Sequence, residues 1–347
     1  MTAARTPSSA LTRFVVASRY MPVYIAFGVL IAVAAIWVPN ALSGVAISQV
    51  APFGAVLAIA ALGQMLVVMT AGIDLSTPAT LTLAMVIMTG VGSQDDARIG
   101  VAVLVALGVA ALIGLVNGIL IGGFKLNALI VTLAVGQVVI GVINRYGRTF
   151  PVQSQAPPSW IEWTNTRTLG MNNVFWIGLG LTILLMLAFR YTTVGRRFQV
   201  VGANPVASHV VGVRVNLNQI LVYVVAALFY AAAGLALAGL LRTPGVAVNN
   251  QYLLGPIAAV VIGGASLTGG LASAGSTFVA AVFLTGLNQV MRTMGLGTAL
   301  QFVVFGIVII GGMLVSGDRI IKGVEQLLRE RRRSRSPNDQ TTEAQAS

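Results

Sequence analysis

The chain alternates long apolar runs with short polar or charged segments. Residues 20–73 and 243–291 contain no charged side chain, and shorter charge-free runs cover 75–94, 99–124, 126–144, 168–189, 215–241 and 293–317. One helix needs roughly 20 apolar residues to cross the hydrocarbon core of a bilayer. The two longest runs therefore have room for two crossings each, and the six others for one each. This pattern predicts about ten transmembrane helices.

The apolar runs are hydrophobic on nearly every side, as at 181–188 and 307–315. Strands of a membrane barrel would alternate, because one face meets lipid and the other meets the lumen. Helices and closed barrels are the two structures that pair every backbone group inside a bilayer. We therefore predict an all-α, polytopic membrane protein with its transmembrane domain at 20–317. Residues 1–19 form a short segment before it, and the polar tail 318–347 is predicted to be disordered.

Composition supports a membrane protein and excludes several other classes. Hydrophobic residues make up 56% of the chain and charged residues 9%, unlike an ordinary globular domain. Much of the formal charge of +12 comes from arginines beyond the last apolar run. The chain has no basic stripe interleaved with aromatic residues, so we expect no nucleic-acid partner. The chain has no cysteine and one histidine, and it lacks a phosphate-binding loop with its lysine. We expect no metal, no cofactor and no catalytic site of its own.

The distribution of Lys and Arg predicts the orientation of the chain. One side carries the basic residues of the N-terminal segment, of the loop 191–216 and of the segment after the last helix. The other side carries only Arg98, Arg145, Arg148, Arg167, Arg242 and Arg292. Positive residues concentrate on the cytoplasmic side of membrane proteins. Both termini are therefore predicted to be cytoplasmic, in a multi-pass protein of the bacterial inner membrane, and the segment 145–172 becomes the longest external loop.

The longest internal loop, 191–216, contains signals for a short helix. Asn204 is a favourable N-cap and Pro205 suits the first helical position, so a helix is predicted from there until Gly212, after the turn 202–205. A plain connecting loop would not need such a capped helix.

The external loop contains Trp160 and Trp163, which suit either a docking surface or anchoring at the lipid headgroups.

Asp74 is the main ionisable group deep in the apolar pattern. It lies in the sequence Gly72-Ile73-Asp74-Leu75-Ser76, where Gly72 and Pro78 predict a break in the helix. A carboxylate at that depth needs a partner or a wet path. Alternatively, Asp74 caps the next helix at a membrane surface by bonding backbone amides near Ser76 and Thr77, without contact to cargo.

Several uncharged polar residues also fall inside the apolar runs, and their amides either contact a polar cargo or tie helices together. Together with the helix break they form the candidate translocation residues: Gly72, Asp74, Ser76, Gln64, Asn117, Gln137 and Asn288. Gly114, Gly118 and Gly122 recur every four residues and predict close packing of one helix against another.

Three blocks in order resemble the permease family of ATP-binding cassette (ABC) importers for ribose, galactose, xylose and related simple sugars. They are the run at 72–76, the stretch 193–213 with its Gly-Ala-Asn-Pro turn, and the glycine-rich block 257–270. The resemblance covers about residues 20 to 320. Ala203, Val206 and the segment 271–274 depart from the family pattern, which leaves the subfamily and cargo open.

The resemblance implies a type II importer permease that moves a monosaccharide with energy from partner subunits. The implied partners are two ABC ATPase subunits, an extracytoplasmic sugar-binding protein and a second permease copy, identical or paralogous, in the lipid bilayer. The loop 191–216 would then be the segment that couples to the ATPase, through Gly195, Arg196, Gly202, Asn204, Pro205, Ala207 and Gly212.

Two other functions fit the same apolar pattern. ABC permeases for branched-chain amino acids or nucleosides share this architecture. An ion-coupled secondary transporter is a weaker alternative, because such proteins use intramembrane ionisable groups and only Asp74 is a good candidate.

Overall fold

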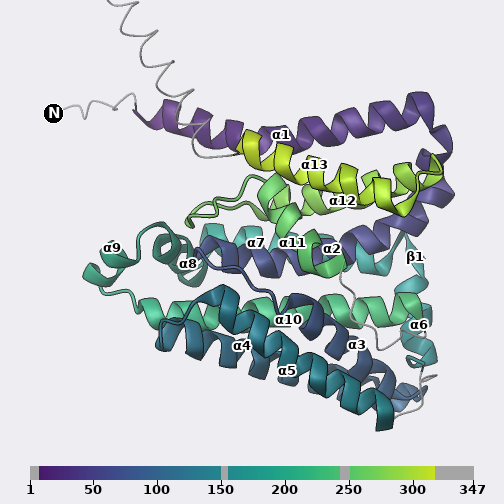
Figure 1. Cartoon of the computed structure of the whole chain (residues 1–347), viewed down its shortest axis with the longest axis horizontal. Coiled ribbons are helices and arrows are strands. Elements are labelled where there is room, and N and C mark those ends of the chain that lie inside the picture. Colours follow the sequence, from purple (N-terminus) through teal and green to yellow (C-terminus); the bar gives the residue numbers. More distant parts are fainter. Residues whose placement is uncertain (1–7, 150–154, 243–250, 317–347) are drawn as a thin grey trace, which may run out of the picture.

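The computed structural model describes residues 8–149, 155–242 and 251–316, which are almost entirely helical (Figure 1). The longer helices are α1 (Ser8–Trp37), α2 (Gly44–Met69), α3 (Thr77–Gly92), α4 (Ile99–Gly118), α5 (Ala128–Thr149), α7 (Asn173–Tyr191), α10 (Val215–Leu241), α11 (Gln251–Ile262), α12 (Ala274–Thr293) and α13 (Thr298–Ser316). Shorter elements are η1 (Pro39–Leu42), η2 (Asp96–Arg98), the π-helix η3 (Ile119–Gly123), α6 (Pro158–Asn165), α8 (Thr193–Ala203) and α9 (Pro205–Val210), with a hairpin of β1 (Arg167–Thr168) and β2 (Met171–Asn172).

The helices follow the predicted apolar runs. Within the described residues, seven helices are long and apolar enough to cross a membrane, and three shorter apolar helices lie in α3, α11 and α13. The two longest runs each hold two helices, and every other run holds one. This confirms a polytopic helical membrane protein. The predicted disordered tail and residues 1–7 lie outside the described residues.

Two helix boundaries differ from the sequence pattern. The apolar run begins at residue 20 and the apolar span of the helix at Arg19, but the helix that contains it, α1, begins at Ser8. No glycine or proline interrupts 8–21, so the helix continues beyond the apolar run. At the other extreme, α3 has 16 residues. At 1.5 Å per residue it is about 24 Å long, less than the roughly 30 Å of a bilayer core.

Helices α2 and α10 form the centre of the bundle. Helix α10 packs against α2, α3 and α4, while α2 also contacts α7, α11 and α12. The glycine repeat on α4 and η3 meets α10, as predicted. A Cβ added at Gly114 would lie 2.5 Å from the carbonyl oxygen of Tyr223, and one at Gly118 would lie 2.8 Å from the Cα of Ile220. Small residues thus let two backbones touch where lipid provides little hydrophobic drive for association.

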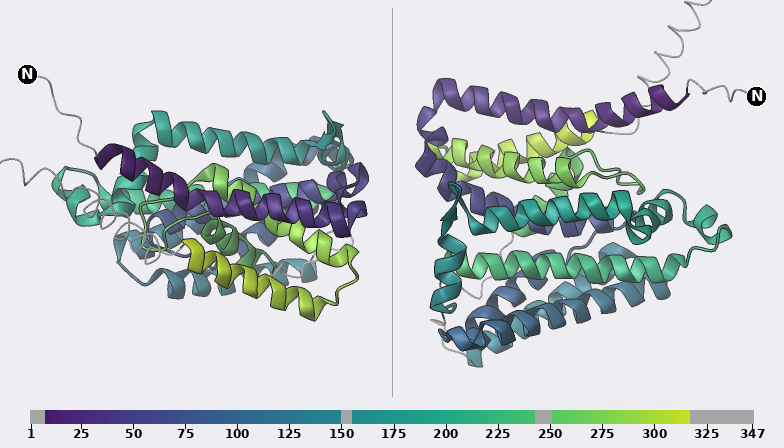
Figure 2. Two further views of the ribbon diagram at one scale, coloured as in Figure 1. Left: turned by 90° about the horizontal axis from the view of Figure 1, so that it is seen from above. Right: turned by 180° about the vertical axis from the view of Figure 1, so that it is seen from behind.

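The two ends of the bundle carry different structures. The start of α1 lies at the same end as α8 and α9, whereas α6 and the β-hairpin lie at the opposite end (Figures 1 and 2). This arrangement places the start of α1 and the loop 191–216 at the same end of the bundle. It also separates the loop 191–216 from the longest predicted external loop by the length of the bundle.

Candidate functional site

The chain between α2 and α3 turns back into the bundle and buries a carboxylate. The amides of Thr70, Ala71 and Gly72 bond back to the last turn of α2, and Ala71 has a left-handed φ of 60°. Asp74 is 2% exposed and Ser76 is 1% exposed. The Oδ1 atom of Asp74 accepts hydrogen bonds from the amide (2.8 Å) and the hydroxyl (2.6 Å) of Ser76. These bonds supply the partners that a buried carboxylate requires.

A glutamine from α2 fixes the backbone of this segment. The Gln64 side-chain oxygen accepts from the amide of Asp74 (3.1 Å), and its nitrogen donates to the Asp74 carbonyl (3.1 Å) and to the Tyr230 hydroxyl (3.0 Å). Gln64 precedes the end of α2 by more than one turn, and Tyr230 stands near the middle of α10. The segment therefore lies inside the bundle, and Asp74 accepts from the Ser76 amide there, the bond that the capping alternative predicted.

Two further helices complete the arrangement. Asn117 on α4 donates to the Ser76 hydroxyl (3.0 Å), and the Thr132 hydroxyl on α5 accepts from the Leu75 amide (2.9 Å). Five helices, α2, α3, α4, α5 and α10, thus meet at one point. We call residues 70–76 together with Gln64, Asn117, Thr132 and Tyr230 the polar break.

The structure brings together five of the seven candidate translocation residues. Gln64, Asp74, Ser76 and Asn117 share hydrogen bonds, and a Cβ added at Gly72 would lie 2.5 Å from the Tyr223 hydroxyl. The other two lie elsewhere: Gln137 is exposed on α5, and Asn288 is partly buried on α12.

The sequence did not indicate a role for Thr132, Tyr223 or Tyr230, because single hydroxyls in apolar helices carry no local signal of their partners. Asn117 Oδ1 and the Tyr223 hydroxyl are buried and have no hydrogen-bond partner within the described residues. Most buried polar atoms in proteins are paired. The polar break therefore keeps unused capacity for a polar guest or a water molecule.

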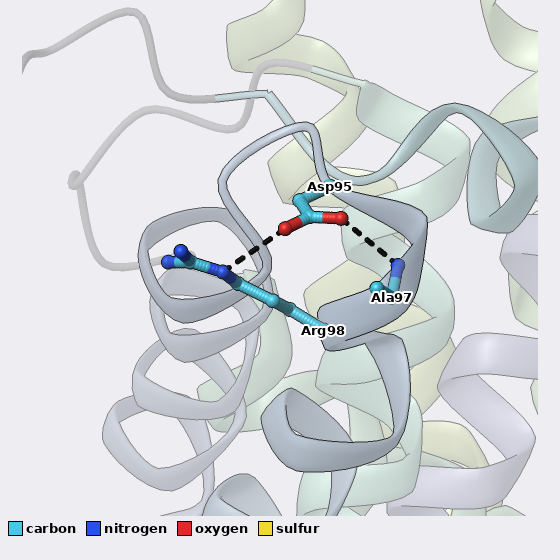
Figure 3. Close-up of polar contacts among 3 residues, drawn as sticks. All are labelled: Asp95, Ala97 and Arg98. Carbon is cyan, nitrogen blue, oxygen red and sulfur yellow. Dashed lines mark hydrogen bonds and ion pairs between the residues drawn. The ribbon is translucent and has the colours of Figure 1, made fainter.

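A second aspartate makes the same local turn in a different setting. Asp95 Oδ1 accepts from the amide of Ala97 (3.0 Å), two residues on, as Asp74 does from Ser76. Its other oxygen lies 3.1 Å from Arg98 Nε, and both side chains are about half exposed (Figure 3). Exposed pairs of this kind contribute little to stability. Burial, rather than turn geometry, distinguishes Asp74.

The loop 191–216 forms two capped helices. The Asn204 side chain accepts from the Ala207 amide (3.0 Å), which confirms the predicted capping of α9. Residues 193–203 form α8, although the pattern had suggested a helix only after Asn204. The hydroxyl of Thr192 caps α8 by accepting from the Gly195 amide (3.1 Å). The sequence does not make this cap obvious, because a Thr three residues before a Gly is not a clear signal for a helix start.

Helix α9 protrudes from the bundle (Figure 1), and its exposed side chains are largely apolar. Val206, Val210 and Val211 are 76%, 81% and 72% exposed. Ser208 is the buried residue of the helix, and its hydroxyl donates to the Val200 carbonyl (2.9 Å), tying α9 to α8. A rigid, capped helix with exposed valines suits contact with a partner. Arg196 is also exposed, whereas Gly195 is buried against the Ala188 carbonyl.

Three backbone segments meet where α8 ends. A Cβ added at Gly202 would overlap the Met69 carbonyl oxygen, and the Gly270 amide donates to that same oxygen (2.8 Å). Gly269 adopts a φ of +93° and contacts the Gly202 carbonyl. We call Met69, Gly202, Gly269 and Gly270 the glycine joint. Since Met69 ends α2, this joint connects α8 directly to the segment that forms the polar break.

Comparison with known proteins identifies the family. A family model described as "Branched-chain amino acid transport system / permease component" matches residues 46–315. The chain belongs to this permease family. The ribose import permease protein RbsC of Escherichia coli (strain K12) is 31% identical over 300 residues, covering 85% of this chain and 92% of the relative.

Two more relatives have similar coverage. The fructose import permease protein FrcC of Rhizobium meliloti is 32% identical, over 78% of this chain and 76% of its own length. The galactose/methyl galactoside import permease protein MglC of Escherichia coli (strain K12) is 27% identical, over 83% and 91%. No solved structure matches. The family confirms the resemblance noted in the sequence, and it makes the chain a transport permease rather than an enzyme.

Proposed function

We propose that this permease forms the membrane passage of an ABC importer for a simple sugar. It works in the bacterial inner membrane with both termini in the cytoplasm, paired with a second permease copy. Two ATPase subunits bind at the α8–α9 end, and a sugar-binding protein delivers cargo at the opposite end. The similarity to ribose, fructose and galactose import permeases over most of the chain is the observation that carries the substrate class.

The contacts support a route for coupling. A partner that moves α9 moves α8 with it, because Ser208 and the Asn204 cap join the two helices. At the glycine joint, α8 touches the Met69 carbonyl without an intervening side chain. A displacement there would shift the start of the polar break. Rigid elements that meet in this way can transmit a change between two arrangements of a bundle.

The chemistry of the polar break suits a neutral cargo. The Asp74 carboxylate already accepts hydrogen bonds from Ser76, and the other side chains of the polar break carry amides and hydroxyls. Ion-coupled transporters commonly use intramembrane ionisable groups for the coupling ion. Apart from Asp74, the polar break offers uncharged hydrogen-bonding groups, which can exchange with sugar hydroxyls without a counter-ion.

A branched-chain amino acid importer is the second candidate, because the family description itself names that cargo. Gentle-detergent purification from the native host, with mass spectrometry of associated proteins and released small molecules, tests both. An ATPase, a secreted binding protein and a released monosaccharide would support our proposal. A released amino acid would favour the second candidate, and uptake by vesicles on an ion gradient without ATP would refute both.

A further inference from the structure

A pocket opens at the end of the bundle opposite α8 and α9. It has a volume of about 380 Å³, within the range of about 300–1,000 Å³ that is usual for ligand sites. Its walls come from the first turns of α2, the end of α6, the β-hairpin and the last turn of α10. The side chains used below are Ser48, Gln49, Phe53, Asn165, Arg167 and Asn172.

Asn172 presents a buried oxygen that the protein leaves unused. The residue is 6% exposed, and its Nδ2 donates to the Thr164 carbonyl (3.3 Å) while Oδ1 has no hydrogen-bond partner within the described residues. Asn172 also occupies the N-cap position of α7, where asparagine normally bonds a backbone amide, yet its side chain makes no capping bond. This oxygen is therefore an unpaired acceptor on a residue that lines the pocket.

The remaining groups supply a mixture of donors and acceptors. Asn165 uses its Nδ2 on the carbonyls of Ile161 (2.8 Å) and Gly239 (3.2 Å), so its oxygen is the group left to accept. Ser48 donates to the Val45 carbonyl (2.8 Å) and can accept as well. Gln49 and Arg167 are exposed and bring further donors, and Phe53 adds a partly exposed aromatic surface.

This inventory favours a neutral polyol over an anion. Each sugar hydroxyl can both donate and accept, so it can satisfy the asparagine oxygens as well as the arginine and glutamine donors. A phosphate or carboxylate offers only acceptors and would oppose the oxygens of Asn165 and Asn172. The ring of Phe53 provides a surface for the apolar C–H face of a sugar.

We propose that this pocket is a low-affinity monosaccharide subsite at the outer mouth of the permease, where the sugar pauses between the binding protein and the passage. The inference rests on the proposed function and adds a permease-borne binding step to it. Affinity should be weak, because two of the contributing side chains, Gln49 and Arg167, are exposed.

The test uses the importer reconstituted in proteoliposomes with its ATPase and binding protein. The variant is Gln49→Leu combined with Arg167→Leu, both at exposed positions. Matched controls are Ile47→Ala on α2 and Leu169→Ala at the hairpin, which do not line the pocket. We expect the variant to lower the maximal uptake rate about tenfold, equivalent to about 1.4 kcal/mol, at an unchanged KM for the loaded binding protein. Basal ATP hydrolysis should not change.

Uptake equal to that of the controls would overturn the proposal. A raised KM at an unchanged maximal rate would also overturn it, because that result describes a docking surface for the binding protein.

A second measurement separates this inference from the proposed function. Saturation-transfer NMR on the permease in nanodiscs, with D-ribose, D-fructose, D-galactose, D-galacturonate and L-leucine as probes, reports binding without transport. Signals from a neutral sugar that disappear in the double variant would support the subsite even if uptake identified another cargo. Signals unaffected by the variant, or strongest for D-galacturonate or L-leucine, would refute it.

Discussion

The polar break and helix α9 represent opposite uses of polar and apolar residues. At the polar break, side chains of α2, α4 and α5 bond to residues 74–76, and Tyr230 on α10 bonds to Gln64, at distances of 2.6 to 3.1 Å. Helix α9 has one buried residue and displays its valines outward. The first region is fixed by the chain itself, whereas the second leaves apolar side chains exposed, which the proposed ATPase partner would cover. The glycine joint is the direct backbone contact between them.

Replacing a joint glycine should have the largest effect, because it breaks the connection between the two regions. In Gly202→Val the added atoms would overlap the Met69 carbonyl, and backbone cannot move aside as a side chain can. We expect uptake in proteoliposomes to fall at least about 100-fold, with reduced yield of monodisperse protein. Gly180→Val on α7 is the control, since a Cβ there meets nothing within 4 Å. Normal uptake by Gly202→Val would refute the joint.

Removing the buried carboxylate should be the next most damaging change. Asp74→Ala leaves the amide and hydroxyl of Ser76 without their acceptor, a loss of about 1–3 kcal/mol. We expect a lower thermal midpoint in detergent and uptake reduced about tenfold, with Asp74→Asn less affected because it keeps an oxygen. Asp95→Ala makes the matched change at an exposed turn, and should cost under about 0.5 kcal/mol. Equal midpoints for the two alanine variants would contradict the role of burial.

Charging α9 should reduce uptake without changing stability, which is the reverse of a defect in the core. Val206 and Val210 are exposed, so Val206→Asp with Val210→Asp leaves internal packing intact. We expect a several-fold loss of uptake and of cargo-stimulated ATP hydrolysis, and weaker co-purification of the ATPase. His209→Ala, exposed on the same helix, controls for altered helix stability. A full complement of bound ATPase would show that α9 is not the docking helix.

The sequence predicted these two regions unequally, for physical reasons. The lengths of the charge-free runs located the transmembrane helices, and Asn204 followed by Pro205 indicated the start of α9. Both features can be recognised in a short stretch of sequence. The break at Asp74 was also visible as a carboxylate beside Gly72. Its surroundings were not: Tyr230 pairs with Gln64 across 166 positions of the chain, and nothing in either segment specifies that meeting. Met69 likewise meets Gly202 and Gly270 only because the bundle folds back on itself.

The smallest effect is expected for a polar residue that the sequence grouped with the polar break but the structure separates from it. Gln137 is exposed on α5. Its neighbour Gly136 faces the polar break instead, since a Cβ added there would lie 3.3 Å from the Cα of Ser76. Gln137→Leu should therefore leave uptake within about twofold of the wild type, whereas Gln64→Leu removes the pairing with Asp74 and should resemble Asp74→Ala. Uptake and thermal midpoint measured side by side would separate them. A large loss of uptake in Gln137→Leu at an unchanged midpoint would place its side chain on the passage or against the second permease copy, and the passage would then extend beyond the polar break along α5.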